Sequence, residues 1–593
     1  MNKINKKIYK GIILEKTAYV CYFYQNIASG VKRYSMKINT TALNYIKKNA
    51  SPYKLHIIVL TVLSTVSGIM GAVSALFLRN VINNAVAKNE AAFWQSFIVM
   101  TCFIAAGILL SAAARRLSAY TVTSLENTLR LRLFMSILKG DYAEASKEHS
   151  GMWMNRLTSD ASAVAGEAVG LLPGITGTAA RLISAVVIIV SAAPGFLYVI
   201  LAGGLIALLG AIKFRKKMKE LYKLVREKDG SLRMRLQDYL GSLVIVRTYA
   251  AEDTAAEDVS EKMNDYRAAV MRRTRFSNIM NIGFAGIMEG GYLFAAAFCG
   301  YAILTGTMDY GTFAAMLDLV GQVQGPLAGI SGFVPRFVSL IGSAERLMEF
   351  DSEYTGKQLL PEPEKISGIE DFYASGFTGL GLDGVTFTYP GDEQPVLTDF
   401  SLFAEKNSSV ALTGFSGCGK STALKILMGL YKPDSGESYV LTQDGRIKDE
   451  KLLKYRRLFA YVPQGNLLMS GTIRDVVAFS RRDLAGDTER INRALEISCA
   501  LGFVSELEKG IDTELGENGA GLSEGQMQRL AIARAVFSGS PVLMLDECTS
   551  ALDAETEKQL LENLRSLSGK TVLLVTHRRS AVDACDREIS FGN

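Results

Sequence analysis

Six long apolar segments in the first 350 residues constrain this chain more than any other feature. Each approaches or exceeds the roughly 18–20 residues needed to cross the hydrocarbon core of a bilayer. Buried helices of a soluble protein are neither this numerous nor this long, so we expect six transmembrane helices. The predicted spans are approximately Leu55–Leu78, Ser96–Ala114, Val169–Ala193, Gly195–Ile212, Ile282–Thr305 and Phe313–Ile341.

The connections between these spans alternate in length and charge. Three of them are short and almost uncharged: Asn83–Ala92, Ser191–Gly195 and Gly306–Gly311. The other two, Arg115–Met154 and Lys213–Arg275, are long and rich in Arg and Lys. Because basic connections stay on the cytoplasmic side, we expect both long connections and both termini to be cytoplasmic.

The long connections have helical patterns that continue the spans beyond the bilayer. Arg115–Lys139 and Lys213–Arg247 are the predicted helical extensions. Gly140–Trp153 and Ala250–Glu261 are then the cytoplasmic turns at their tips.

Residues 1–42 are predicted to be a basic extension ahead of the first span. Its apolar patch at Gly11–Tyr24 is interrupted by charge, so it is a poor signal peptide and too short to span a membrane. Met36 is an alternative start, which would leave residues 1–35 outside the native protein. We expect the membrane domain to comprise residues 43–350 and to begin with a helix on the inner membrane surface.

A glycine-rich loop at residues 414–422 predicts a site for the phosphates of a nucleoside triphosphate. It has the pattern G-x-x-x-x-G-K-S, follows the apolar run Ser409–Thr413 and precedes the helical run Ala423–Met428. Such a loop points backbone N–H groups at phosphate oxygens, and the helix adds its positive dipole end. Lys420 would contact the β- and γ-phosphates, and Ser421 would bind Mg²⁺. The predicted binding residues are Gly414, Ser416, Gly417, Cys418, Gly419, Lys420, Ser421 and Thr422.

Two acidic residues follow the apolar strand predicted at Pro541–Leu545. Ligands of open α/β sheets lie at the C-terminal ends of the strands. There Asp546 would support Mg²⁺, and Glu547 would polarise a water toward the γ-phosphate. A second phosphate site is predicted at Leu522–Gln526, where Ser523 and backbone N–H groups begin a helix.

Short apolar strands alternate with amphipathic helices from Leu382 onward, which predicts an α/β domain at residues 382–593. Residues 351–381 contain Pro361, Pro363 and several glycines and are predicted to be a linker. The expected fold class is an α-helical polytopic membrane domain followed by an α/β P-loop nucleoside triphosphatase domain.

Taken together, these motifs make the C-terminal half resemble the ATPase domain of ATP-binding cassette (ABC) transporters. The chain from about Leu43 to Asn593 resembles an exporter-type half-transporter. The resemblance implies further site residues: Tyr389 stacked on adenine, Gln464 touching Mg²⁺ and the attacking water, Glu517 touching the cytoplasmic loops, Ser523, Gly525 and Gln526 in the signature, Asp553 in a loop that crosses the dimer interface, and His577 bonded to the γ-phosphate. Gln464, Glu547 and His577 are the implied catalytic residues.

Three features depart from the family pattern. Glu524 stands where glycine is commonest in the signature, and Cys548 follows the catalytic glutamate, where Ala or Pro is more usual. We expect Glu524 to be tolerated, because Ser523 and the backbone make the needed contacts. The sequence ends at Asn593, before the family's usual further helices, and we expect the hydrolytic site to be complete without them.

In this family the nucleotide lies between the P-loop of one ATPase domain and the signature of another, so the resemblance implies an obligatory dimer. A homodimer and a heterodimer with a second half-transporter both stay open. The implied function is an ATP-driven exporter that uses Mg²⁺ and ATP in the cell membrane, with both termini cytoplasmic. An importer with the same fold and an ATP-gated channel or regulator are alternatives, and the fold does not identify the substrate.

Charge and cysteine usage narrow the range of partners. The formal net charge of +6 is modest for 593 residues and does not favour nucleic acid. The seven cysteines lack metal-ligand spacing and are predicted to be reduced thiols.

Three charged residues lie within the predicted spans: Arg181, Glu289 and Asp318. Charges at such depths cost at least about 2.5 kcal/mol on insertion scales, so they normally face a partner or a water-filled cavity. Arg181 and Glu289 lie at similar depths, and we expect them to pair. Asp318 has no obvious partner, so we hypothesise that it lines the transport path and favours cationic or polar cargo.

Overall fold

The computed structural model describes residues 40–146, 150–355, 360–465, 468–516, 519, 521–567 and 569–591. Most of the predicted basic extension therefore lies outside the described residues, as does Glu517. The chain divides into two compact units. The helical unit comprises Met1–Leu131 and Asn155–Met348, and the α/β unit comprises Arg132–Met154 and Glu349–Asn593.

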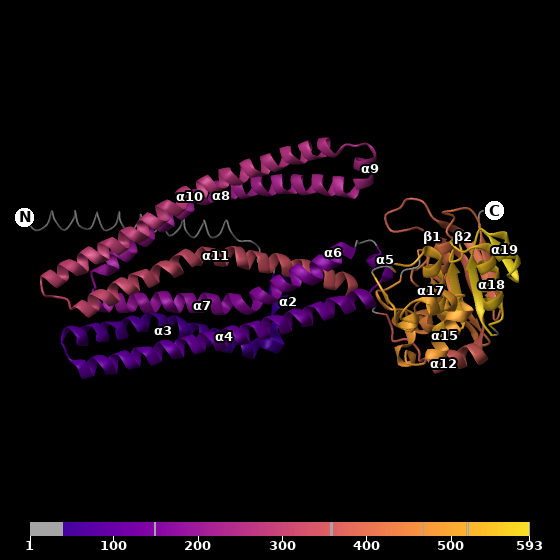
Figure 1. The fold of residues 1–593 in the computed structure, drawn as a ribbon, viewed down its shortest axis with the longest axis horizontal. Helices are drawn as coiled ribbons and strands as arrows, with labels where there is room; N and C mark the ends of the chain where they lie inside the picture. Colours follow the sequence, from indigo (N-terminus) through magenta and orange to yellow (C-terminus); the bar gives the residue numbers. More distant parts are fainter. Residues whose placement is uncertain are drawn as a thin grey trace, which may run out of the picture. The chain divides into compact units, whose positions relative to one another are not determined.

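The helical unit consists of long helices joined by short turns (Figure 1). Its elements are α2 (Thr40–Ala50), the short η1 (Ser51–Tyr53), α3 (Lys54–Val86), α4 (Glu90–Lys139), the π-turn η2 (Arg156–Asp160), α7 (Ala161–Ala192), α8 (Phe196–Gly241), α9 (Leu243–Thr248), α10 (Glu252–Leu304) and α11 (Tyr310–Thr355). Helix α6 (Ser150–Asn155) lies at the boundary, because residues up to Met154 belong to the α/β unit. Both α4 and α11 run from this unit into the α/β unit.

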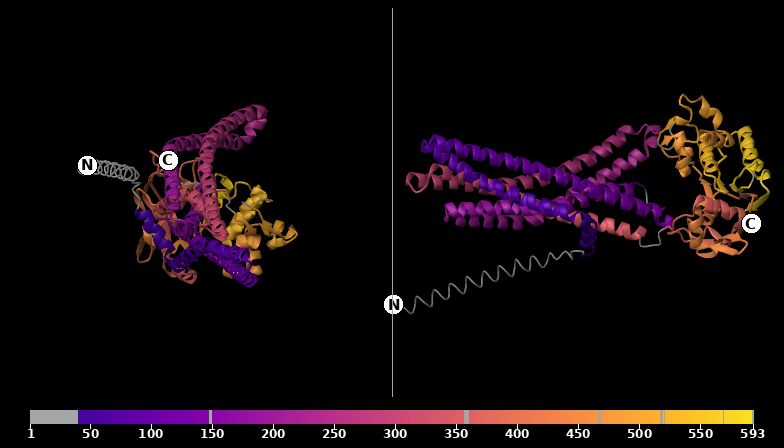
Figure 2. Two further views of the ribbon diagram at one scale, coloured as in Figure 1. Left: turned by 90° about the vertical axis from the view of Figure 1, so that its left-hand side faces the viewer. Right: turned by 90° about the horizontal axis from the view of Figure 1, so that it is seen from below.

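Five helical stretches of the described residues are long and apolar enough to cross a membrane: Thr40–Val86, Glu90–Lys139, Gly151–Ala192, Glu252–Leu304 and Tyr310–Ser352. They cover five of the six predicted spans, of which Val169–Ala193 and Ile282–Thr305 extend one residue further. The remaining one, Gly195–Ile212, lies in α8, whose side chains at residues 197–213 are not described. Helices α8 and α10 lie side by side in Figures 1 and 2.

Two glycines allow α3 and α7 to pack closely. A Cβ atom at Gly68 would lie 2.4 Å from the carbonyl oxygen of Gly177, and one at Gly177 would lie 2.9 Å from that of Ser64. Lipid supplies little hydrophobic driving force between helices, so close backbone approach through small residues is a main source of their association. Gly68 and Gly177 therefore set the spacing of α3 and α7.

The predicted ion pair between Arg181 and Glu289 is wrong. Both side chains are exposed, and among the described residues neither has an ion-pair or hydrogen-bond partner. Arg181 instead lies against α3, where a Cβ at Gly71 would be 3.1 Å from its Nε. Equal depth on two helices does not make their side chains face each other, because the direction of a side chain turns with the helical period.

The cytoplasmic turn predicted at Ala250–Glu261 is shorter than expected. Helix α9 ends at Thr248 and α10 begins at Glu252, so the turn comprises residues 249–251. Ala250 takes a left-handed conformation with φ of 48°. Most of the predicted turn is rich in Ala and Glu, which are strong helix formers, and it forms the first turns of α10.

The α/β unit contains a four-stranded antiparallel sheet, a five-stranded parallel sheet and a small two-stranded sheet. Its strands are β1 (Phe377–Phe387), β2 (Leu397–Glu405), β3 (Ser409–Thr413), β4 (Ser435–Thr442), β5 (Gly445–Lys448), β6 (Phe459–Val462), β7 (Gly471–Thr472), β8 (Glu514–Leu515), β9 (Val542–Asp546), β10 (Thr571–Val575) and β11 (Arg587–Ser590). The strand orders are β2-β1-β4-β5, β11-β3-β10-β9-β6 and β7-β8. Strand β1 begins ahead of Leu382, because Phe377 is buried in the core.

The helices of this unit contribute to two buried cores that lie on the two faces of the parallel sheet. They are α5 (Tyr142–Ala145), α12 (Ile366–Asp371), α13 (Lys420–Leu427), α14 (Ile473–Val477), α15 (Thr488–Ile497), α16 (Leu501–Glu506), α17 (Glu524–Phe537), α18 (Ala554–Arg565) and α19 (Arg579–Asp583), with the short turns η3 (Phe372–Gly376), η4 (Asp449–Leu458), η5 (Phe479–Leu484) and η6 (Gly510–Asp512). Leu573 and Leu574 of β10 are buried in the two different cores, one on each side of the sheet. Burial on both faces explains the continuous apolar run of this strand.

The parallel strands end in register. Val575 of β10 pairs with Asp546 of β9 and with Leu412 of β3, and Val462 of β6 pairs with Leu545. The segments that follow these strands therefore meet at one edge of the sheet.

Helix α5, at the predicted cytoplasmic turn Gly140–Trp153, packs on the α/β core. The rings of Tyr142 and Tyr431 meet edge to face with centroids 5.5 Å apart. The Tyr431 hydroxyl donates to Ser146 Oγ at 3.2 Å, and Ala143 packs against the same core. This turn therefore clusters with the α/β unit and not with the helices from which it extends.

Candidate nucleotide site

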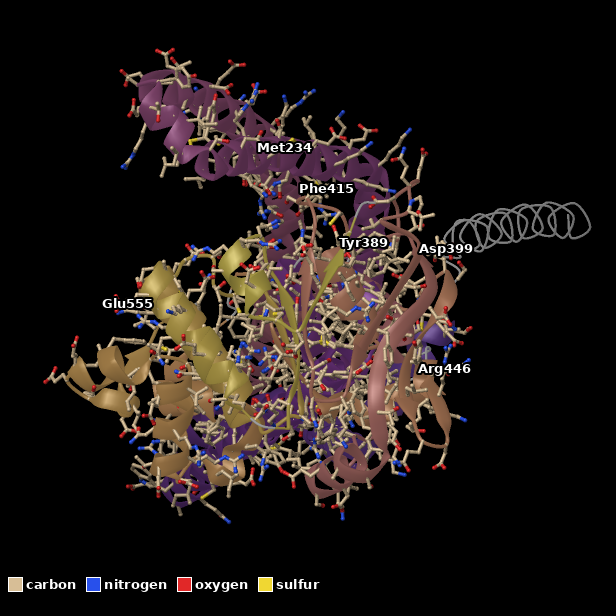
Figure 3. All side chains as sticks on the ribbon, turned by 90° about the vertical axis from the view of Figure 1, so that its right-hand side faces the viewer. Met234, Tyr389, Asp399, Phe415, Arg446 and Glu555 are labelled. Carbon is tan, nitrogen blue, oxygen red and sulfur yellow. The ribbon has the colours of Figure 1, made fainter. Side chains whose placement is uncertain are left out.

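The glycine-rich loop lies between β3 and the N-terminus of α13. Gly414, Gly417 and Gly419 have φ of 143°, 86° and 96°, a region that favours glycine. Lys420 is 5% exposed, and its Nζ donates to the carbonyls of Gly414 and Phe415 at 3.0 and 2.9 Å. The Lys420 ammonium group is therefore held against the backbone of the loop. Phe415, an exposed residue of the same loop, is labelled in Figure 3.

Asp546, the last residue of β9, is fixed by two hydroxyl groups. Ser421 Oγ donates to its Oδ1 and Tyr461 Oη donates to its Oδ2, each at 2.9 Å. Burial raises the pKa of Asp546, and the neighbouring Glu547 raises it further, whereas the two hydrogen bonds lower it. Burial also raises the pKa of Tyr461, so its hydroxyl stays a proton donor. The sequence analysis did not single out Tyr461.

The three predicted catalytic side chains come together from three strands. Gln464 Nε2 donates to Glu547 Oε2 at 2.7 Å, and His577 Nε2 lies 3.1 Å from Glu547 Oε1. Glu547 itself has φ of 49°, a left-handed conformation that is uncommon for a residue other than glycine. Its N–H donates to Val575 O at 3.1 Å, which anchors it to the adjacent strand β10.

The signature residues begin helix α17 with a capping box. Ser523 Oγ accepts from the N–H of Gln526 at 3.3 Å, and Gln526 Oε1 accepts from the N–H of Ser523 at 2.9 Å. A Cβ at Gly525 would lie 2.9 Å from Ala551 O. Glu524 is exposed in the first turn, which fits the expectation that it is tolerated. Within the described residues, no hydrogen bond joins Ser523, Gly525 or Gln526 to the P-loop.

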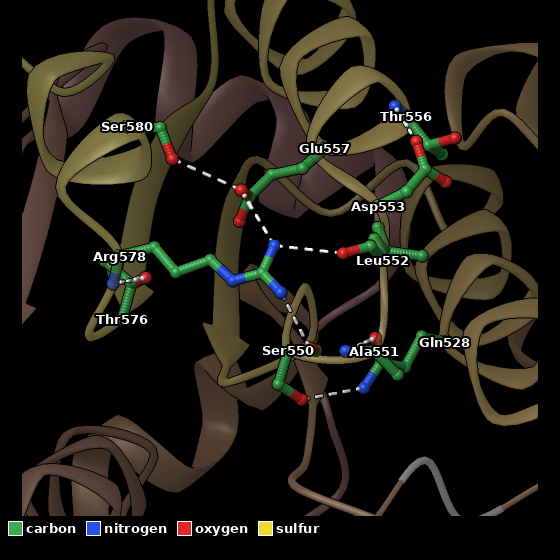
Figure 4. A network of polar contacts seen from close by, with 10 residues as sticks. All are labelled: Gln528, Ser550, Ala551, Leu552, Asp553, Thr556, Glu557, Thr576, Arg578 and Ser580. Atoms are coloured by element: carbon green, nitrogen blue, oxygen red, sulfur yellow. Dashed lines mark hydrogen bonds and ion pairs between the residues drawn. The ribbon is translucent and has the colours of Figure 1, made fainter.

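Asp553 begins α18, where its Oδ1 accepts from the N–H of Thr556 at 2.9 Å. The preceding loop is held by Arg578, which the sequence analysis missed although it adjoins His577 (Figure 4). Arg578 donates to the carbonyls of Leu552 and Ser550 at 3.0 and 2.9 Å and to Glu557 Oε2 at 3.0 Å.

Gln528 ties the same loop to α17. Its Nε2 donates to Ser550 Oγ at 3.0 Å, and its Oε1 accepts from the N–H of Ala551 at 3.1 Å (Figure 4). The loop that carries Asp553 is thus bonded both to the signature helix and to the residue after His577.

Tyr389, labelled in Figure 3, lies beside the P-loop helix. Its hydroxyl is 2.8 Å from Thr422 Oγ1, and its ring meets those of Phe387 and Tyr431 edge-on, with centroids 5.1 and 5.4 Å away.

Among the predicted binding residues, Cys418 has its Sγ 3.7 Å from Lys420 Nζ. The other notable cysteine, Cys548, is buried, and burial raises its pKa to about 12.

Comparison with known families agrees with these two units. Residues 57–327 match the family described as "ABC transporter transmembrane region", and residues 397–550 match the family described as "ABC transporter". The chain belongs to the ABC transporters: it is a multi-pass membrane protein with an ATPase domain that binds nucleotide.

The ATP-dependent lipid A-core flippase of Pasteurella multocida (strain Pm70) is 28% identical over 547 residues, which cover 90% of each chain. ATP-binding cassette sub-family B member 10, mitochondrial, of Mus musculus is 28% identical over 529 residues, covering 87% of this chain and 72% of that protein. The structure of a bacterial Atm1-family ABC exporter with ATP bound matches with a TM-score of 0.69 at 20% identity, covering 90% of this chain and 93% of that one. The structural likeness extends over both units.

Proposed function

We propose that this protein is an ATP-driven exporter of the cell membrane that works as a dimer, with both termini cytoplasmic. The observation that carries the proposal is the arrangement at Glu547, which Gln464 and His577 contact from two neighbouring strands. A protein that only binds ATP has no need of a carboxylate oriented in this way. The relatives named flippase and exporter support outward movement of cargo.

In the proposed reaction each group has one task. The P-loop N–H groups and Lys420 bind the β- and γ-phosphates. Glu547 orients and polarises the attacking water, and His577 donates to the γ-phosphate. Tyr389 would turn its ring to the adenine.

Ser421 and Asp546 would hold Mg²⁺, with Gln464 near it. A hydroxyl oxygen and a carboxylate oxygen 2.9 Å apart are the hard donors that this ion prefers, and phosphate oxygens and waters usually complete its shell. The bound ion would neutralise negative charge on the phosphates. Tyr461 positions Asp546 by occupying the second carboxylate oxygen.

The proposal requires two chains. In the family, the signature of one chain completes the nucleotide site of the other, and here no described hydrogen bond joins Ser523 to its own P-loop. Both elements are present in this chain, which supports a homodimer, whereas a partner half-transporter would give a heterodimer. Closure of the ATPase domains would be passed on through α5, which packs against Tyr431.

The direction of transport can be tested in proteoliposomes that contain lipids with different headgroups and a fluorescent nitrobenzoxadiazole label. External ATP acts only on molecules whose ATPase domains face outward, and dithionite destroys the label in the outer leaflet. An exporter protects label from dithionite as ATP is consumed. Increased exposure of label would indicate an importer, and hydrolysis without net movement of any probe would favour a channel or regulator. No hydrolysis by the purified chain alone would overturn the homodimer.

A further inference from the structure

A polar cavity of about 490 Å³ lies among α3, α4, α7 and α11 of the helical unit. Its charged and hydroxyl-bearing lining residues are Ser64, Ser67, Ser111, Arg115, Thr178 and Arg181, and no acidic residue lines it. Its volume is in the range of sites for small ligands. A cavity with two arginines, four hydroxyl groups and no carboxylate has the electrostatic character of an anion site.

Within the part of the chain that the structure describes, the two arginines of this cavity have no protein partner. Among the described residues, neither Arg115 nor Arg181 forms a hydrogen bond or ion pair. Arginines of the neighbouring helix α11 are paired: Arg336 Nε lies 2.8 Å from Glu167 Oε2, and Arg346 Nη2 lies 2.5 Å from Asp160 Oδ1. Arg181 lies within a predicted membrane span, where an unpaired guanidinium calls for a ligand or a water-filled space, and Arg115 directly follows the predicted span Ser96–Ala114.

A second cavity, of about 440 Å³, shares Arg181, Gly325 and Pro326 with the first. Asp318 and Gln322 line it, and Gln322 Nε2 donates to Asp318 Oδ2 at 2.8 Å. The remaining polar atom, Gln322 Oε1, is buried without a hydrogen-bond partner. A buried acceptor of this kind is costly unless a donor reaches it.

We propose that these adjacent cavities bind the headgroup of an anionic amphiphile that also carries hydrogen-bond donors. Arg181 and Arg115 bind the anionic group, of phosphate or sulfate type, because guanidinium groups match such oxygens in geometry and charge. A hydroxyl or ammonium donor of the same headgroup bonds to Gln322 Oε1 and Asp318. The site lies between membrane-spanning helices, which favours an amphiphile over a soluble anion. The hypothesis of cationic or polar cargo rested on Asp318, because Arg181 was expected to pair with Glu289.

This inference rests on the proposed export function, because it names the class of cargo. Binding can nevertheless be measured without ATP. The full-length protein is placed in phosphatidylcholine nanodiscs, and spin-labelled phosphatidylglycerol is used as the probe. The motionally restricted fraction of the probe reports binding, with dialkyldimethylammonium as the cationic competitor and glycerol phosphate as the soluble one.

We expect phosphatidylglycerol to bind in preference to the cationic amphiphile. Arg181→Gln should weaken binding by at least about tenfold, and Arg181→Lys should restore part of it. Gln322→Leu should weaken binding by a few-fold, because it removes the unpaired acceptor. Arg116→Gln is the matched control, since Arg116 adjoins Arg115 but does not line either cavity, and it should bind and hydrolyse like the wild type.

Equal binding by wild type and Arg181→Gln, in protein of unchanged gel-filtration profile, would overturn the inference. Stronger competition by the cationic amphiphile would do the same. Competition by glycerol phosphate as strong as that by lipid would overturn the assignment to an amphiphile. Loss of ATP hydrolysis in the wild type, with selective lipid binding intact, would count against the proposed function and not against this site.

Discussion

The two units treat their functional polar groups in opposite ways. In the α/β unit Lys420, Ser421, Gln464 and His577 each have a protein partner before any nucleotide is considered. In the helical unit Arg115, Arg181 and Gln322 Oε1 leave hydrogen-bonding capacity unused among the described residues. The comparison indicates that the hydrolytic site is preorganised by the protein, whereas the cavities in the membrane are completed by their ligand.

The most damaging single change to the preorganised site is expected at Glu547. Glu547→Gln keeps the shape but removes the charge that polarises water, so ATP hydrolysis should fall by roughly 10²–10⁴-fold while Mg-ATP still binds. Steady-state ATPase and trinitrophenyl-ATP binding measure the two effects. Glu555→Gln, at an exposed acid in the first turn of α18, is the control and should hydrolyse normally. Turnover near the wild-type rate in Glu547→Gln would refute the assignment.

The helical unit should instead be most sensitive where backbones touch. Gly68→Ala places a Cβ 2.4 Å from the Gly177 carbonyl oxygen and should lower the free energy of unfolding by about 1–3 kcal/mol. Thermal unfolding in detergent measures it. Gly286→Ala in α10 is matched in chemistry but meets nothing within 4 Å, so it should leave the melting temperature unchanged or raise it slightly. Equal melting temperatures for the two variants would contradict the close packing.

Loss of Arg578 tests whether preorganisation extends to the loop before Asp553. Arg578→Gln removes bonds to Leu552 and Ser550 and the ion pair of the buried Glu557 carboxylate, which keeps a hydrogen bond from Ser580 Oγ at 3.2 Å. We expect destabilisation of the α/β unit by about 1–3 kcal/mol, discounted because Arg578 is partly exposed, and a lower maximal ATPase rate. Arg579→Gln, at an exposed neighbour, is the control. A wild-type melting temperature in Arg578→Gln would show that the network contributes little.

The smallest expected effect is a difference in chemical reactivity between two cysteines of the nucleotide site. At pH 8 a maleimide should modify Cys418 and inhibit the ATPase, with Mg-ATP protecting, whereas Cys548 should stay unmodified. Cys548 is 1% exposed and burial raises its pKa to about 12, so its reactive thiolate is scarce until the pH approaches that value. Peptide mapping by mass spectrometry identifies the labelled site. Undiminished inhibition of Cys418→Ala would assign the reactive thiol elsewhere.

The sequence predicted the hydrolytic site better than the membrane cavities, for a physical reason. The P-loop, Asp546 and Glu547 lie in short stretches whose local geometry determines their chemistry, so spacing alone locates them. Arg578 and Tyr461 act through contacts made by folding, and no local pattern distinguished them from ordinary strand-end residues.

In the membrane the available signal was depth along a span, which fixes one coordinate of a side chain and leaves its direction open. That is why the pairing of Arg181 with Glu289 was wrong, although the prediction that Asp318 lines a cavity agrees with the structure. The start of β1 at Phe377 was also missed, because the glycines after it resembled a linker.

The left-handed backbone at Glu547 implies a conflict between the thermal stability of the protein and its ATPase activity. Holding Glu547 at a backbone φ of 49° costs on the order of 1 kcal/mol. The fold tolerates this cost because the conformation directs the carboxylate toward Gln464 and His577. Asparagine adopts this conformation more readily. Laboratory evolution for heat resistance alone, with no requirement for ATP turnover, should therefore enrich Glu547→Asn. Populations that must also hydrolyse ATP should retain the glutamate and gain their heat resistance at other positions.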